Sequence, residues 1–211
     1  MAPQPVPHVG ARLREERLRL GISVRALARD LGVSASLVSQ IETGKSQPSV
    51  STLYAMTTAL GISVEDVFSP AVDGPQPAPT GPGGPTTVLQ ALGSGRGQRV
   101  GPLVTPAERQ VLALDSGVTW ERLGQLPHTH VDFLLITYAP GGTSSSNGRL
   151  MRHHGAEYGF LQSGELVLTL GFDELRLRPG DAVSFDSSTP HRYRNDGTEP
   201  AMGVWFVVEP D

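Results

Sequence analysis

Cysteine is absent from the 211 residues of this chain. Disulfides, thiolate metal sites and cysteine nucleophiles are therefore excluded, and the absence is compatible with a reducing compartment. Lysine occurs once, at Lys45, so arginine carries nearly all of the positive charge. The chain has no run of about 18 apolar residues, the pattern of a membrane-spanning helix. Its first ten residues lack the basic segment and apolar core of a signal peptide. We therefore expect a cytoplasmic protein that has no contact with a membrane.

Glycine and proline are abundant, with 25 and 18 copies, and many of them gather in one segment. Between Pro70 and Pro85, six of the 16 residues are proline and four are glycine. This segment has no apolar periodicity from which to build a core, and its prolines favour an extended chain. We interpret residues 70–88 as a linker between a helical domain, residues 8–69, and a strand-rich domain, residues 95–209. A long loop within one domain is the alternative.

Charge is distributed unevenly between the two halves. The whole chain has 17 basic and 21 acidic side chains and a net charge of −4. Residues 1–70 hold seven of the basic and six of the acidic groups, and the remainder has a net charge of −5. A generally basic surface for nucleic acid is thereby excluded. The N-terminal half, with a net charge of +1, is the part suited to a polyanion.

Five helices are predicted in the N-terminal half from apolar spacing and capping residues. Ser34 is a typical N-cap for the third helix, and Ser63 with Asp66 forms a capping box for the fifth. Gly32 separates the second and third helices by a turn of about three residues, which is the spacing of a helix-turn-helix. In that motif the second helix of the pair enters the major groove of DNA. The expected helices span residues 9–20, 24–31, 34–43, 49–60 and 63–68.

Residues 9–68 resemble the xenobiotic-response-element family of bacterial regulators, which has the phage-repressor fold. The matching residues are Ala28, Gly32, Val33, Ser34, Ser39, Ile41, Glu42, Gly44, Lys45, Pro48, Ser49, Leu53, Ala59, Leu60 and Gly61. The resemblance implies that the third helix places Ala35, Ser36 and Gln40 against base edges. It also implies a partly buried, bidentate ion pair between Arg17 and Glu42, which would hold the first helix to the third.

The third helix and its surroundings supply the candidates for contact with DNA. Gln40 can bind adenine through two hydrogen bonds, and Ala35 can touch a thymine methyl group. An ordinary solvent-facing residue is the alternative for Gln40. Because the neighbouring side chains are small, part of the sequence preference is expected to come from DNA shape. The candidates on and around this helix are Ser34, Ala35, Ser36, Ser39, Gln40 and Thr43. The candidates for phosphate contact, through side chains or through the amides at helix N-termini, are Ser23, Arg25, Lys45, Gln47 and Ser49.

Short alternating runs separated by turn residues fill the C-terminal half and predict a sandwich or barrel. The expected strands span residues 110–114, 118–123, 131–138, 157–162, 165–170, 175–178, 182–185, 191–194 and 201–208. Residues 138–208 resemble the small cupin domains, which are double-stranded jelly-roll barrels. The matching residues are His153, Glu157 and Gly164 in a first motif and Gly180, Asp181, Pro190, His191 and Asn195 in a second. The expected fold is a multi-domain α + β chain, with a five-helix lambda-repressor-like bundle joined by a Pro/Gly linker to an all-β cupin.

Cupins that hold a metal usually present two histidines and a glutamate from the first motif and one histidine from the second. Met151 stands at the first histidine position here, so the resemblance leaves His153, Glu157 and His191. Two histidines and a carboxylate suit non-haem iron with open positions, and manganese and zinc are further candidates. A metal-free polar ligand pocket is the alternative, and the sequence favours neither. Three other histidines are interpreted as lying outside the ligand set: His128, His130 and His154.

Two functions from different classes fit this organisation. The first is a transcription regulator whose helical domain binds a double-stranded DNA operator, while the cupin binds a small-molecule effector and supports a homodimer. A subset of five aromatic residues would line the effector pocket: Tyr158, Phe160, Phe185, Tyr193 and Trp205. The second is a non-haem iron oxygenase, because the domain order resembles hydroxypropylphosphonate epoxidase. That enzyme uses a lysine of its helical domain, where Gly21 stands in this chain. We therefore favour the regulator and assign no catalytic residue.

Overall fold

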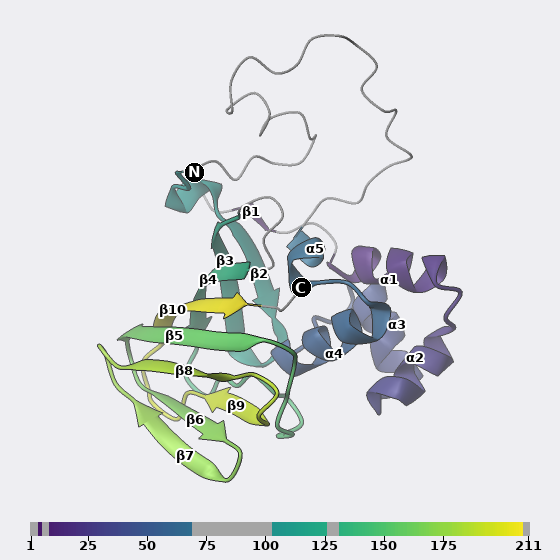
Figure 1. Cartoon of the computed structure of the whole chain (residues 1–211). Helices are drawn as coiled ribbons and strands as arrows, with labels where there is room; N and C mark the ends of the chain where they lie inside the picture. The colour runs from purple at the N-terminus through teal and green to yellow at the C-terminus, as the bar shows by residue number, and fades with distance from the viewer. Residues whose placement is uncertain (1–3, 6–8, 69–102, 126–130, 209–211) are drawn as a thin grey trace.

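The computed structural model describes residues 4–5, 9–68, 103–125 and 131–208 (Figure 1). Helices come first along the chain and strands follow, in the order that the sequence predicts. The predicted linker, residues 70–88, lies outside the described residues, as do His128 and His130. The linker and the two domain boundaries therefore stay predictions.

Five α-helices form a bundle: α1 (Val9–Arg19), α2 (Val24–Leu31), α3 (Ala35–Glu42), α4 (Val50–Leu60) and α5 (Val64–Phe68). A capping side chain accepts a hydrogen bond from one of the backbone N–H groups that the first turn of a helix leaves without a partner. Ser23, Ser34 and Ser49 cap α2, α3 and α4 in this way, which confirms the predicted cap at Ser34. Ser63 and Asp66 exchange the hydrogen bonds of the predicted capping box before α5. None of the described helices is long and apolar enough to cross a membrane.

A buried ion pair joins α1 to α3. Arg17 donates from Nε to Oε1 of Glu42 at 2.5 Å and from Nη2 to Oε2 at 2.8 Å, which is the predicted bidentate contact. The two side chains are only 6% and 4% exposed. The helices approach closely because Gly10 has no side chain; a Cβ there would lie 1.8 Å from the carbonyl oxygen of Ile41. The pair therefore fixes α3 on the bundle from its inner side.

The strands form two sheets that make up the barrel. They are β1 (Gln4–Pro5), β2 (Gln110–Leu114), β3 (Val118–Gly124), β4 (Val131–Tyr138), β5 (Ala156–Ser163), β6 (Leu166–Leu170), β7 (Asp173–Leu177), β8 (Ala182–Asp186), β9 (His191–Arg194) and β10 (Ala201–Val208). The larger sheet has the order β1-β2-β3-β4-β10-β5-β8, and the smaller has the order β7-β6-β9. Every predicted strand is present to within two residues at each end. β1 was not predicted; its two residues precede the helices and pair in parallel with β2.

Large aromatic side chains fill the interior of the barrel. Trp120, Tyr193 and Trp205 are each at most 2% exposed. Trp205 lies directly against β5 because residue 159 is glycine; a Cβ at Gly159 would lie 2.7 Å from the indole ring. The barrel interior is therefore a packed core, and the side chains that lie against this core define the candidate site.

The helical bundle packs against the barrel through α4 and α5, as Figure 1 shows. The N–H of Ser51 in α4 donates to the carbonyl oxygen of Ser144 at 2.9 Å. Gln110 in β2 donates from Nε2 to the carbonyl oxygen of Phe68 at 3.1 Å, and the Arg122 guanidinium lies 5.2 Å from the centre of the Phe68 ring. Buried apolar side chains of the two halves form one continuous cluster. The sequence did not predict this interface.

Replacing Arg17 by Ala should destabilise the helical bundle, because the Glu42 carboxylate would stay buried without its partner. Losing one partner of a buried ion pair costs about 3–5 kcal/mol. The measurement is thermal unfolding of the full chain followed by far-ultraviolet circular dichroism. The matched control is Arg14→Ala, since Arg14 is exposed on the same helix. An unchanged melting temperature combined with an altered DNA sequence preference would contradict the bracing role of Arg17.

Candidate functional site

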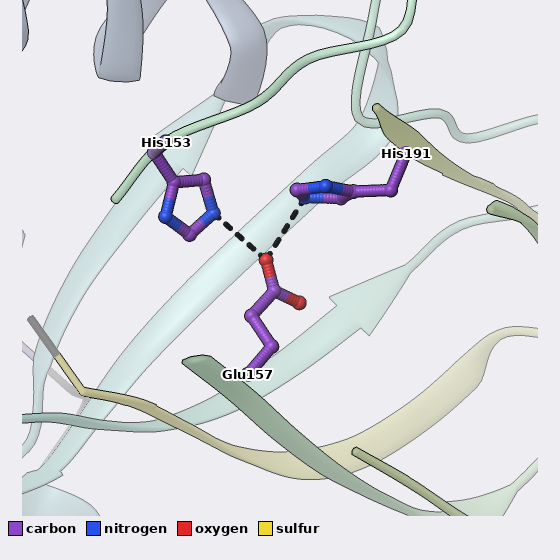
Figure 2. Close-up of side chains that lie close together, drawn as sticks. All are labelled: His153, Glu157 and His191. Atoms are coloured by element: carbon purple, nitrogen blue, oxygen red, sulfur yellow. Dashed lines mark hydrogen bonds and ion pairs between the residues drawn. The ribbon is translucent and has the colours of Figure 1, made fainter. Parts of the chain in front are cut away.

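Three buried side chains meet inside the barrel, as the sequence predicted (Figure 2). Glu157 lies on β5, His191 begins β9, and His153 lies in the segment before β5. Nε2 of His153 is 2.8 Å from Oε1 of Glu157, and Nε2 of His191 is 3.0 Å from the same oxygen. Their ligand atoms all lie within 4.8 Å of one another. His154 is exposed and takes no part.

Backbone pairing brings these residues together from distant parts of the sequence. The N–H of Met151 donates to the carbonyl oxygen of His191 at 2.9 Å, and the N–H of His191 donates back at 2.8 Å. This bridge holds the segment that carries His153 beside β9. Burial alternates along β5, so Glu157 faces the interior while Tyr158 faces outward. The side chains of His153, Glu157 and His191 thus converge because of the hydrogen-bonding register between their segments, and that register depends on the whole sheet.

The second ring nitrogen of each histidine lies against a backbone carbonyl. Nδ1 of His153 is 3.2 Å from the carbonyl oxygen of His154, and Nδ1 of His191 is 2.9 Å from that of Thr189. A carbonyl oxygen only accepts, so each Nδ1 carries a proton and each Nε2 is left to face Glu157. Nε2 of His191 is buried and its contact with Glu157 lacks hydrogen-bond geometry. Two Nε2 atoms that face one carboxylate oxygen need a proton or a metal ion between nitrogen and oxygen, and this donor set fits a divalent metal ion.

The charges in the cluster also favour a cation. Burial on its own would raise the pKa of Glu157, but its contacts with His153 and His191 lower that pKa to about 2. Burial would likewise lower the pKa of His191, but the neighbouring carboxylate of Glu157 raises it above its ordinary value. The Glu157 carboxylate is therefore ionised near neutral pH. It stabilises positive charge on the histidines or on an ion that they bind.

Three of the five aromatic residues expected around a pocket lie against this cluster. Tyr193 donates from its hydroxyl to Oε2 of Glu157 at 3.2 Å, and Trp205 donates from Nε1 to the Tyr193 hydroxyl at 3.3 Å. The Phe185 ring meets His191 edge to face, with 5.1 Å between the ring centres. These contacts hold two groups in place: Oε2 of Glu157, which is the carboxylate oxygen that faces neither histidine, and the ring of His191.

The other two aromatic residues require a correction. Tyr158 and Phe160 are 51% and 47% exposed, because both occupy the outward positions of β5. They do not line the barrel interior. Whether odd or even positions of β5 face inward depends on how the two sheets pack, and the alternation alone does not reveal it. Their exposed rings lie beside Phe206 of β10 on the outer face of the larger sheet.

The interior has almost no free space. The cavity next to Glu157 has a volume of about 10 Å³, and its walls include Trp120, Tyr138, Met151 and Tyr193. A single water molecule needs roughly 10–15 Å³. The expected effector pocket is therefore closed in this arrangement, and an organic ligand of any size must displace a side chain to reach the histidines.

One residue of the site comes from the helical bundle and was missed from the sequence. Tyr54 of α4 is 4% exposed, and its ring stacks on His153 with 4.1 Å between the ring centres and 5° between the planes. It also meets Trp120 edge to face at 6.0 Å. The available signal was the composition of α4, which has buried apolar residues on more than one face. A helix that is apolar on several sides has a second surface to bury.

The outer face of α3 is open, although the bundle is docked on the barrel. Val38 and Ile41 are buried beneath it, whereas Ser36, Ser39 and Gln40 are exposed. The remaining candidates that are exposed are Ser23, Arg25, Ser34, Thr43, Lys45 and Gln47, and Ala35 is half-buried. These residues are therefore accessible to a DNA duplex, and the contacts assigned to them stay predictions.

Ser49 requires a correction among the phosphate candidates. Its side chain is 2% exposed, and its hydroxyl accepts a hydrogen bond from the N–H of Thr52. The same hydroxyl lies 3.1 Å from that of Ser51. Because these contacts bury it as the N-cap of α4, the Ser49 side chain does not face a phosphate.

Comparison with known proteins matches both halves of the chain. Residues 8–67 match the helix-turn-helix domain family, and residues 134–207 match the cupin domain family. The chain is 27% identical over 188 residues to the HTH-type transcriptional regulator PuuR of Escherichia coli, an alignment that covers 88% of this chain and 86% of PuuR. The alignment therefore extends over most of both proteins.

A solved structure shares the fold. The crystal structure of an HTH_3 family transcriptional regulator from Vibrio cholerae has a TM-score of 0.62 and 22% identity, and the match covers 97% of this chain and 96% of that one. The hydroxypropylphosphonic acid epoxidase from S. wedmorenis has a TM-score of 0.43 and 18% identity, with 96% of this chain and 97% of that chain covered. The second similarity is too low to support an argument about activity.

The raised pKa of His191 predicts how the stability of the metal-free protein changes with pH. A histidine whose pKa is higher in the folded state stabilises the fold below its unfolded pKa of 6.5, and this contribution is lost as the pH rises through the folded value. The melting temperature should therefore fall as the pH rises above about 6.5 in a chelator-treated sample. His191→Asn should remove this dependence, and His154→Asn, at an exposed position, should retain it. Identical pH profiles for wild type and His191→Asn would contradict the assignment.

Proposed function

We propose that this chain, which carries a helix-turn-helix domain followed by a cupin domain, is a sequence-specific DNA-binding transcription regulator of the bacterial cytoplasm. The observation that supports the proposal most directly is that α3 is held in place and exposed on its outer side. The Arg17–Glu42 ion pair holds this helix from its inner side, while Ser36, Ser39 and Gln40 remain exposed on its outer side. The similarity to a relative named as an HTH-type transcriptional regulator, over most of that protein's length, supports the same function.

The proposed contacts with DNA are of two kinds: contacts to base edges, which read the sequence, and contacts to phosphates, which position the helix on the duplex. Gln40 reads adenine through two hydrogen bonds, and Ala35 and Ser36 contact neighbouring base edges. Arg25, Lys45 and other exposed groups around α3 bind phosphates and set the register of the helix on the duplex. The phosphate candidates are Ser23, Arg25, Lys45 and Gln47. Because few side chains reach the bases, sequence-dependent DNA shape supplies the rest of the specificity.

A homodimer provides the affinity that one bundle lacks. Residues 1–70 have a net charge of only +1, so a single helical domain gains little from the DNA phosphates. Two bundles on one duplex contact two half-sites, which lie about one helical turn apart in related motifs. The linker proposed for residues 70–88 and the interface between bundle and barrel together set the distance between the two reading helices.

The barrel is proposed to sense a small molecule through a metal ion. His153, Glu157 and His191 would hold a divalent cation, with iron, manganese and zinc as the candidates for this donor set. The orphaned Nε2 of His191 and the ionised Glu157 support this proposal. The ion would supply open coordination positions to an oxygen-donor effector. A ligand changes DNA binding only if it binds the competent and incompetent forms unequally.

An oxygenase is the weaker proposal. The two histidines and one carboxylate are compatible with non-haem iron, but the lysine expected from the epoxidase resemblance is replaced by Gly21. That glycine is exposed, and among the described residues no group outside its own neighbours would lie within 4 Å of a Cβ at its position. Among the described residues, the helical bundle contributes Tyr54 and Val50 to the barrel cavity, and neither side chain is basic.

Replacing Gln40 by Ala should weaken binding to the preferred sequence by about 1–3 kcal/mol, because two hydrogen bonds to adenine are lost. Fluorescence anisotropy with a duplex selected from a random pool measures this loss, and the same experiment at several salt concentrations should give a steep salt dependence. Gln162→Ala is the matched control, since Gln162 is an exposed glutamine of the barrel. Equal affinity of the wild type for the selected and a scrambled duplex would contradict sequence-specific binding.

Replacing His191 by Ala should abolish stoichiometric metal binding, because one of three ligands is lost. Dialysis against Zn²⁺ or Mn²⁺ followed by mass spectrometry of the metal content measures the effect. Wild type should retain about one ion per chain, as should His154→Ala, whose side chain is exposed and outside the cluster. Wild-type protein without bound metal, or equal retention by His191→Ala, would contradict the proposed site.

A further inference from the structure

The DNA-binding half supplies one wall of the site inside the barrel. Tyr54 of α4 stacks on His153 and is 4% exposed, so its side chain points away from its own bundle and into the barrel. Val50, one turn earlier on the same helix, lines the same cavity. The other described residues that line this cavity belong to the barrel half. The helix that follows the DNA-reading helix therefore closes the barrel over a candidate metal ligand.

We propose that Tyr54 couples the contents of the barrel to the position of the DNA-binding helices. The inference rests on the proposed function and adds the path of regulation. With a cavity volume of about 10 Å³, the closed barrel has no room for a chelating small molecule. The Tyr54 ring covers His153 from the side of the helical bundle, so a ligand that enters from that side to reach the ion held by the cluster displaces this ring. The Tyr54 ring is packed between His153 and Trp120 with almost no free volume to rotate into, so its displacement moves α4 away from the barrel.

Two backbone contacts carry this movement to the reading helix. The N–H of Ser51 donates to the Ser144 carbonyl, and the N–H of Asp115 donates to the Pro48 carbonyl, each at 2.9 Å. Pro48 lies in the short connection between α3 and α4, so the anchored segment is next to the reading helix along the chain. The docked arrangement leaves Gln40 exposed and fixes the bundle on the barrel. Because a docked bundle holds the two reading helices of the proposed dimer at one distance, the docked arrangement is the one that binds DNA, and ligand entry lowers DNA affinity by releasing the bundle.

Closure of the barrel is tested by quenching the two tryptophans with acrylamide. Trp120 and Trp205 are the chain's only tryptophans, and each is 1% exposed inside the barrel. The quenching constant should be low in wild type and in Tyr54→Phe, which keeps the stacked ring, and several-fold higher in Tyr54→Ala. The control Tyr158→Ala removes an exposed tyrosine from the outer sheet face and should behave as wild type. Equal quenching of Tyr54→Ala and wild type would overturn the closure.

Coupling is tested by operator affinity with and without Zn²⁺ and acetohydroxamate, a chelating probe with two oxygen donors. The probe should weaken wild-type binding by a factor within the usual range of about 5- to 150-fold. Tyr54→Phe should respond like wild type, and Tyr54→Ala should lose the response. An unresponsive wild type, or an equal response in Tyr54→Ala, would overturn the coupling.

A reversible lock tests the same movement without altering Tyr54. The chain has no cysteine, so the double variant Ser51→Cys, Ser144→Cys places one cysteine pair across the contact between α4 and the barrel, and thiol titration after oxidation verifies that the disulfide has formed. The oxidised protein should bind the operator with an affinity that the probe does not change. Reduction of the disulfide should restore the loss of affinity on addition of the probe. A full response from the oxidised protein would overturn the proposal. If wild type binds no operator, the proposed function fails, whereas the quenching experiment still decides whether Tyr54 closes the barrel.

Discussion

The buried ion pair between Arg17 and Glu42 is the constraint on which the DNA-binding surface depends. Its two hydrogen bonds join α1 to the inner side of α3, and the missing side chain of Gly10 lets the two helices come this close. A buried charge pair adds little net stability compared with apolar packing, but it tolerates few alternative geometries. The outer residues of α3 are therefore presented to solvent in one fixed orientation.

The core of the barrel contains a buried charged group, which is costly unless it is compensated. It buries an ionised carboxylate between two imidazoles, and it satisfies the outer nitrogens of both rings with backbone carbonyls. This arrangement is stable only with a cation at the cluster, whether a proton on a histidine or a metal ion. The aromatic residues around it exclude water, which strengthens every charge interaction inside the cluster. The site is thus chemically specific but closed, and its opening involves the helical half.

Local features were predictable from the sequence, and features set by distant packing were not. The serine caps, the capping box at Ser63 and the strand positions follow from residues close together along the chain. The meeting of His153, Glu157 and His191 was predictable because cupin motifs fix their register. The inward face of β5 was not, since alternation leaves both faces possible, and Tyr158 and Phe160 consequently face solvent. Tyr54 was missed because its partner His153 lies about a hundred residues away, in the other domain.

DNA recognition by the exposed side of α3 is the central requirement of the proposed regulator. Footprinting of the full-length protein on the DNA upstream of its own gene, with and without added metal, tests this most directly. We expect a discrete protected region with two half-sites separated by about one helical turn of the duplex. Uniform protection without sequence preference at all protein concentrations, or no protection at low salt, would contradict it.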